Sequence, residues 1–227
     1  MKDVLTWSDR LAQMTDEWSE LRDSSAADAM KIAGWEQDLR TMTVEEHALR
    51  RAGRWRSGPR TLLAALGLQQ RELALTAGLA WILNPEGHHG LGSLFVKEFA
   101  VLCGADAPDG GPVTITVEET REDTRADLVL RCSTFTLVLE CKVWALEQPD
   151  QCRRLANLWA DEDPVLVFLT PRGLAPVTAG DTEERWRCLT WADVTNRLRA
   201  ATLEAPQPAY GVLDYLETLA NDLGRTI

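Results

Sequence analysis

The stretch LVLECKVWALEQPDQCRRL, residues 137–155, changes character in its middle. Its first residues, preceded by Phe135, suit a strand in a hydrophobic core, yet the strand continues directly into Glu140 and Lys142. Charged side chains at the end of a buried strand cost free energy unless they are paired or bind an ion. A helix-like run follows at once and carries Gln151. The stretch therefore joins a core strand to a group of polar side chains that needs a chemical reason.

The segments around this stretch predict a mixed β-sheet. Residues 113–117 alternate valine and isoleucine with threonine, and residues 126–131 and 134–140 form two further predicted strands joined by a short polar turn. Residues 165–170 are apolar on both faces, so we expect that strand to be central. A helix over residues 147–160 connects the third strand to the fourth. A meander followed by a helical crossover gives an α/β fold with helices on both sides of the sheet.

Most of the remaining chain is predicted to be helical. The expected helices of the domain cover residues 61–83, 91–102, 191–203 (with Thr190 as its N-cap) and 209–222. Two amphipathic stripes in residues 1–48 predict two further helices, one through Trp7, Leu11, Met14, Trp18 and Leu21 and one through Ala29, Ile32, Ala33, Trp35 and Leu39. These helices either pack together or form a surface for a protein partner or a second subunit.

Charge and composition limit the classes of protein to which this chain can belong. The net charge of −11 argues against a nonspecific nucleic-acid coat, which would be basic, but not against an enzyme that acts on nucleic acid. Residues 1–46 hold eleven acidic and five basic residues, a net of −6. No apolar run is long enough to cross a membrane, no signal peptide is evident, and the five cysteines form no CxxC pair. We therefore expect a cytoplasmic protein with reduced thiols.

An arginine-rich segment separates the acidic N-terminal region from the rest of the chain. We expect a helical extension and linker over residues 1–58 and an α/β domain over residues 59–227. Arginines around an aromatic ring can hold a phosphate backbone and stack on a base, or they can form a solvated linker. The candidate nucleic-acid contacts are Arg50, Arg51, Arg54, Trp55, Arg56 and Arg60.

The turn between the second and third strands fixes which charges meet. If a two-residue turn lies at 133–134, Cys132 pairs with Phe135, and Asp127 then lies opposite Glu140. Because alternate residues of a strand share a face, Lys142 projects to the same side as Glu140. A slip of one residue would send Asp127 to the opposite face.

Two neighbouring carboxylates and a lysine suit a divalent cation. The carboxylates repel each other unless a cation lies between them, and Mg²⁺ prefers one or two carboxylates with water and phosphate oxygens completing its shell. A bound metal polarises a phosphate and activates a water, while Lys142 orients that water or stabilises developing negative charge. The other interpretation is a buried ion-pair network of Asp127, Glu140 and Lys142 without catalysis.

These residues resemble the PD-(D/E)XK nuclease superfamily, whose fold is that of restriction endonucleases. Asp127 followed by Glu-x-Lys at 140–142 matches its triad. ELALTAGLAWILNPEGHHGLGSLFVKEF (72–99) is similar to the N-terminal signature of a bacterial branch of PD-(D/E)XK nuclease family proteins, and VFLTPRGLAP (167–176) is similar to its next strand. The resemblance covers residues 60–222. It implies a mixed central sheet of about four to five strands flanked by helices, with the N-terminal helical extension outside it.

The resemblance also implies roles for individual residues. Asp127 and Glu140 become metal ligands, Lys142 the catalytic lysine, and Gln151 a glutamine near the active site. Glu72 either completes the metal site or is an exposed acid in the first turn of a helix. Further candidates are Glu118 or Glu119, as another carboxylate or a surface charge, and His89, as a loop hydrogen bond or a group near the scissile phosphate.

Two functions follow as expectations. The first is a Mg²⁺-dependent nuclease, with Mn²⁺ as a substitute, that hydrolyses phosphodiester bonds as a DNA endonuclease in bacterial antiphage defence or DNA processing. The second is a binding or assembly module that keeps the nuclease fold without cutting and acts through its acidic N-terminal helices. RNA is an alternative substrate that the sequence does not exclude.

Overall fold

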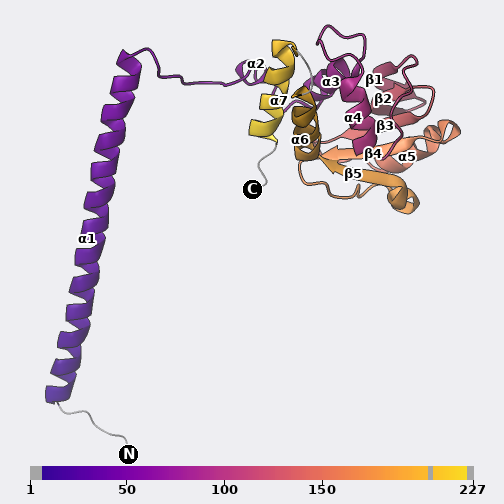
Figure 1. Cartoon of the computed structure of the whole chain (residues 1–227). Coiled ribbons are helices and arrows are strands. Elements are labelled where there is room, and N and C mark those ends of the chain that lie inside the picture. The colour runs from indigo at the N-terminus through magenta and orange to yellow at the C-terminus, as the bar shows by residue number, and fades with distance from the viewer. Residues whose placement is uncertain (1–6, 204–206, 224–227) are drawn as a thin grey trace, which may run out of the picture. The chain divides into compact units, whose positions relative to one another are not determined.

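The computed structural model describes residues 7–203 and 207–223. The chain divides into two compact units, Met1–Ser57 and Gly58–Ile227, and each is described by itself. Figure 1 shows the helical first unit and the α/β second unit with their elements labelled. Among the described residues, no helix is both long and apolar enough to cross a membrane.

The first unit contains one continuous helix, α1 (Trp7–Arg51), of 45 residues. The prediction of two helices within residues 1–48 was therefore wrong. The segment contains no proline, and a single glycine, Gly34, costs only about 1 kcal/mol in a helix interior. The two predicted apolar stripes also keep one phase, because Leu11 and Ile32 are three seven-residue repeats apart. A single helix carries both stripes.

The second unit is built on a five-stranded mixed sheet in the order β1-β2-β3-β4-β5. The strands are β1 (Thr114–Arg121), β2 (Thr124–Arg131), β3 (Thr136–Cys141), β4 (Val165–Thr170) and β5 (Trp186–Thr190). β1, β2 and β3 are antiparallel, whereas β4 and β5 run parallel to β3. This confirms the mixed α/β sheet and the position of β4 between two strands. β5 was not predicted because it has only five residues and follows a 3-10 helix, η2 (Gly180–Arg185). The sequence before it therefore lacks the pattern of an α-helical crossover.

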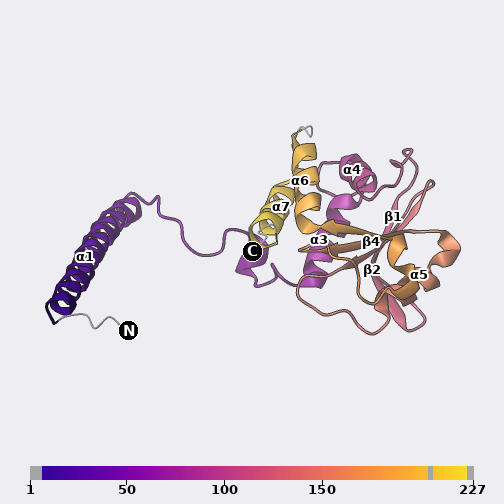
Figure 2. The same ribbon diagram turned by 90° about the horizontal axis from the view of Figure 1, so that it is seen from below.

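Helices cover both faces of the sheet. They are α2 (Leu62–Ala65), α3 (Glu72–Leu83), α4 (Leu94–Leu102), α5 (Gln151–Leu158) with the 3-10 helix η1 (Ala160–Glu162), α6 (Trp191–Thr202) and α7 (Tyr210–Asp222). One core packs α3, α4, α6 and α7 against one face, and a smaller core packs α5 against the other. In Figure 2, which views the same ribbon from below, α5 lies apart from α4, α6 and α7. Thr190 caps α6 in a capping box with Asp193, as predicted for its N-cap.

The β2–β3 hairpin has the predicted register. The Cys132 N–H donates to the Phe135 carbonyl at 3.1 Å, and Leu128 pairs with Leu139. Continuing that pairing by one residue sets Asp127 opposite Glu140. The hairpin therefore brings two carboxylates from different strands to one end of the sheet.

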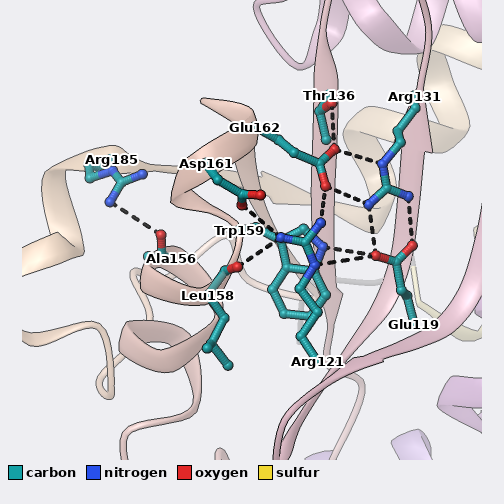
Figure 3. Close-up of polar contacts among 10 residues, drawn as sticks. All are labelled: Glu119, Arg121, Arg131, Thr136, Ala156, Leu158, Trp159, Asp161, Glu162 and Arg185. Atoms are coloured by element: carbon teal, nitrogen blue, oxygen red, sulfur yellow. Dashed lines mark hydrogen bonds and ion pairs between the residues drawn. The ribbon is translucent and has the colours of Figure 1, made fainter.

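An ion-pair network ties β1 and β2 to the end of the α5 crossover (Figure 3). The Arg131 guanidinium donates to both oxygens of Glu119 at 2.6 and 2.7 Å and to both oxygens of Glu162 at 2.6 and 2.7 Å. Arg121 bridges Glu162 and Asp161 and lies 4.7 Å above the Trp159 ring. The network joins β1, β2 and η1, so it holds the crossover connection against the edge of the sheet.

Replacing Arg131 is expected to destabilise the fold in a pH-dependent way. Hydrogen bonds to Arg131 are the largest cause lowering the pKa of Glu162, to about 2, and Arg131 also lowers the pKa of Glu119. A lowered carboxylate pKa contributes stability above its unfolded value near 4.5 that is lost as the pH falls toward 2. Arg131→Ala should lower the free energy of unfolding by about 1–3 kcal/mol at pH 7.

Chemical denaturation of the full chain between pH 3 and pH 7 measures this effect. The difference between wild type and Arg131→Ala should be constant above pH 5 and shrink at lower pH. Arg199→Ala, which removes the exposed pair with Glu217, is the control and should change stability by less than about 1 kcal/mol. Equal effects of the two substitutions would contradict the stabilising role of the network.

Candidate active site

A pocket of about 410 Å³ opens at the end of the β2–β3 hairpin where the two carboxylates meet. The first turns of α3 and α5 and the loop after β3 complete its walls. Its lining includes Glu72, Asp127, Lys142, Gln151, Arg125 and Arg154. Four of the residues predicted from the sequence thus line one pocket, with Glu140 buried beneath them.

Glu140 is completely buried, and only one of its two oxygens is paired. Its Oε1 accepts from Lys142 Nζ at 2.5 Å and from Gln151 Nε2 at 2.6 Å. Its Oε2 has no hydrogen-bond partner among the described residues, although no solvent reaches it. A buried carboxylate oxygen without a partner costs free energy, so it marks a place where a cation or a polar ligand would be favoured.

Asp127 is held in place by the backbone of the neighbouring strand. Its Oδ2 accepts from the Cys141 N–H at 2.7 Å. Burial is the main influence on the Asp127 carboxyl and raises its pKa, while this hydrogen bond and Lys142 oppose the change. This bond holds the Asp127 carboxylate beside Glu140. It leaves the Oε2 atom of Glu140 unpaired.

The charges of the site are strongly coupled. Burial raises the pKa of Glu140 to about 8, and repulsion from Asp127 adds to the effect. Burial alone would lower the pKa of Lys142, but attraction to Glu140 and Asp127 outweighs it, and the net pKa is raised. Lys142 therefore stays protonated at neutral pH and acts as a hydrogen-bond donor.

Gln151 and the loop after β3 orient these groups. Gln151 is the first residue of α5, and its Oε1 accepts from the Gln148 N–H at 3.1 Å, which leaves Nε2 to donate to Glu140. The backbone carbonyl of Lys142 accepts from Trp191 Nε1 at 3.2 Å, and the backbone N–H of Lys142 donates to the Leu169 carbonyl at 2.8 Å. Both neighbours of Glu140 in the site are thus fixed by the protein around them.

Glu72 lines the pocket and holds the loop that follows β3. Its Oε1 accepts from the N–H of Val143 at 2.8 Å and of Ala145 at 3.3 Å. It begins α3 and is only partly exposed, so it differs from the exposed first-turn acid that was the alternative. Its negative charge also raises the pKa of Asp127 and Glu140, after the larger effect of burial.

The structure separates the two adjacent glutamates of β1. Glu118 lines a smaller pocket of about 220 Å³ with Glu72 and Asp127, where it pairs with Arg125 at 2.9 Å. Glu119 uses both oxygens on Arg131 and also accepts from Trp159 Nε1 at 3.2 Å. Glu119 therefore belongs to the ion-pair network, and Glu118 is the one beside the candidate site.

His89 is a buried loop residue and does not line the pocket. The Leu91 N–H donates to its Nδ1 at 3.1 Å, and its Nε2 lies 2.6 Å from the Asn84 carbonyl, to which it donates. This matches the loop hydrogen bond expected as one interpretation of His89.

The arginine-rich segment makes local contacts with the end of α1. Arg50 pairs with Glu46 at 2.7 Å and lies 5.0 Å above the Trp55 ring, and the segment 50–60 is exposed. Its contact with nucleic acid remains a prediction.

Two arginines of the pocket were not predicted from the sequence. Arg125 pairs with Glu118, but Arg154 lines the pocket with its Nε buried and without a partner among the described residues. Arg153, its neighbour on α5, is instead exposed and pairs with Asp150 at 3.0 Å. The spacing in the sequence could have identified Arg154, because it lies one helical turn after Gln151 and so shares its face.

These residues fit a divalent cation held by few protein ligands. No group of three or more histidine, cysteine or acidic residues in the described part of the chain has the geometry of a complete metal cage. Mg²⁺ takes one or two carboxylates and keeps waters or phosphate oxygens, and Asp127 with the unpaired oxygen of Glu140 supplies that number. Asp127 and Glu140 are the residues that would hold the ion.

Comparison with models of protein families identifies the family of this chain. The family model described as PD-(D/E)XK nuclease superfamily matches residues 61–218, which include all the residues that line the pocket. Neither the curated proteins nor the solved structures contain a match to this chain.

Replacing Glu140 with glutamine is expected to stabilise the metal-free protein at alkaline pH. Because the folded-state pKa of Glu140 is raised from 4.5 to about 8, the fold loses stability as the pH rises between these values. Gln keeps the shape and does not titrate. In the presence of a chelator, Glu140→Gln should melt at a higher temperature than wild type at pH 8.5, and the gain should shrink or reverse at pH 5.

Glu217→Gln, on α7 and outside the pocket, is the control for the loss of one negative charge. A gain for Glu140→Gln that is the same at pH 5 and pH 8.5 would contradict the burial of a titrating carboxyl at this position.

Proposed function

The chain belongs to the PD-(D/E)XK nuclease superfamily, whose members are usually nucleases and generally use divalent metals, and we propose that it is a Mg²⁺-dependent DNA endonuclease. The observation that carries the proposal is the pairing at Glu140. One oxygen is held by Lys142 and Gln151, and the other is buried without a partner beside Asp127. A purely structural ion pair would satisfy both oxygens.

The residues of the pocket divide the work of phosphodiester hydrolysis. A metal on Asp127 and Glu140 would polarise the phosphate and lower the pKa of a water. Lys142, protonated and anchored on Glu140, orients the attacking water and stabilises the negative charge that grows on the phosphate. Gln151 keeps Glu140 in one orientation. The guanidinium of Arg154, which lines the pocket, supplies donors for a phosphate oxygen.

The biological setting is a further part of the proposal. The resemblance of residues 72–99 to a bacterial branch of the family supports DNA processing or antiphage defence with DNA as the substrate. These assignments rest on the resemblance alone.

Removal of Glu140 or Lys142 should abolish cleavage. Purified full chain is incubated with plasmid DNA, single-stranded DNA and RNA, with Mg²⁺, Mn²⁺ or chelator. We expect metal-dependent cutting of DNA that falls by at least about 100-fold in Glu140→Ala and Lys142→Ala. Lys97→Ala, an exposed lysine of α4, is the matched control and should retain activity.

Each other outcome has a clear meaning. Activity that survives in both variants would place the chemistry elsewhere, and cleavage of RNA alone would correct the substrate. Wild-type protein that binds DNA but cuts none of the substrates with either metal would favour the non-cleaving module.

Arg154 is expected to contribute to phosphate binding, whereas Arg153 is not. Arg154→Ala should lower kcat/KM for DNA cleavage about 10–100-fold because it removes a charged donor from the pocket. Arg153→Ala, one residue away and exposed, should change kcat/KM by less than about threefold because exposed pairs contribute little. Equal losses would show that α5 acts only through its overall positive charge.

A further inference from the structure

Helix α1 exposes an unusual number of large apolar side chains. Nine large apolar residues are exposed in its described part, and seven of them lie along one face of the helix. These seven are Leu11, Met14, Trp18, Ile32, Trp35, Leu39 and Met42. A single exposed apolar residue needs no explanation, but seven along one face of a helix mark an interaction surface.

The seven residues repeat with the period of a coiled coil. Successive members are three or four residues apart within residues 11–18 and within residues 32–42, and the 14 residues from Trp18 to Ile32 equal two heptads. All seven therefore occupy positions a and d of one heptad register. The other two exposed residues, Met30 and Val44, both fall at position f, on the outside of such a helix. A strict period of 3.5 drifts around a straight α-helix of 3.6 residues per turn and closes into a seam only when two helices supercoil.

We propose that α1 forms a parallel, in-register, two-stranded coiled coil with α1 of a second copy of this chain. A helix of 45 residues provides about six heptads, more than the three or four that indicate a coiled coil. Burying the row of tryptophan, leucine, isoleucine and methionine supplies the packing of one helix face from which most helical stability in proteins comes. This proposal is independent of the proposed enzymatic function.

The charges beside the seam favour a second copy in parallel orientation. In that arrangement position g of one helix meets position e of the next heptad in the partner. Lys31 then faces Glu36 of the second copy, and Glu45 faces Arg50, so both charged pairs attract. Asp38 faces the uncharged Thr43. The acidic extension can thus associate with itself despite its net negative charge.

Polar residues in the seam fix the register. Ser25 and Glu46 occupy position a and Asp28 occupies position d. In-register pairing places Ser25 and Asp28 opposite the same residues of the second copy. A shift of one heptad would instead set them against the apolar Ile32 and Trp35. Lys31, 3.6 Å from Asp28 in the same helix, offsets part of the charge that Asp28 brings to the seam.

Sedimentation of the full chain tests the seam. Wild type should sediment as a dimer of twice 25.3 kDa at micromolar concentration. Leu39→Lys, which puts a charge in the seam, should weaken the dimer by roughly 100-fold or more. Met30→Lys introduces the same side chain at position f and should leave the dimer intact. A monomeric wild type, or equal weakening by the two substitutions, would overturn the proposal.

Exchanging the charges of Lys31 and Glu36 tests whether the partner helix is α1 of a second copy and whether it runs parallel. Lys31→Glu and Glu36→Lys should each weaken the dimer about 3–30-fold, because each creates two like-charged contacts across the symmetric seam. The double variant should dimerise more tightly than either single variant. Failure of that rescue would overturn the parallel pairing, and a dimer that all these variants leave unchanged would place the contact outside α1.

Discussion

The arrangement of the α/β unit depends on one buried carboxylate, Glu140. Burying it at the end of β3 is costly, and the surrounding protein satisfies only one of its oxygens. Lys142 supplies a charge from the same strand, and Gln151 supplies a donor from the start of α5. Asp127 adds a second carboxylate from β2. The hairpin, the crossover helix and the loop held by Glu72 all converge on this residue, and the apparent defect in its hydrogen bonding is what makes a metal site there chemically sensible.

Much of the sheet could be predicted from local patterns. Alternating threonine and branched residues mark β1, and the short turn at 133–134 sets the register that brings Asp127 to Glu140. These predictions succeed because period and turn length act within a few residues. β5 escaped because it is short and its neighbours carry no helical crossover, so its pairing with β4 is decided by tertiary contacts alone.

In the candidate site, too, contacts between residues close in sequence could be predicted, whereas contacts between distant segments could not. Glu140, Lys142 and Gln151 lie within twelve residues and share one local pattern, so their proximity could be predicted. The pairing of Arg131 with Glu162 spans 31 residues and two connections, and no spacing rule reveals it. It took the structure to assign Glu119 to that network and Glu118 to the pocket. Arg154 could have been separated from Arg153 by its spacing, because it lies one helical turn after Gln151 in α5 and so shares its face.

The central claim is that the unpaired oxygen of Glu140, with Asp127, holds a divalent cation. Titration of the full chain with Mn²⁺, followed by electron paramagnetic resonance of the free ion at pH 8, measures that binding without reference to activity. The account predicts that wild type binds Mn²⁺, that Glu140→Gln weakens binding by at least about 10-fold, and that Glu119→Gln, in the ion-pair network outside the pocket, binds as wild type does. Undiminished binding in Glu140→Gln would contradict it.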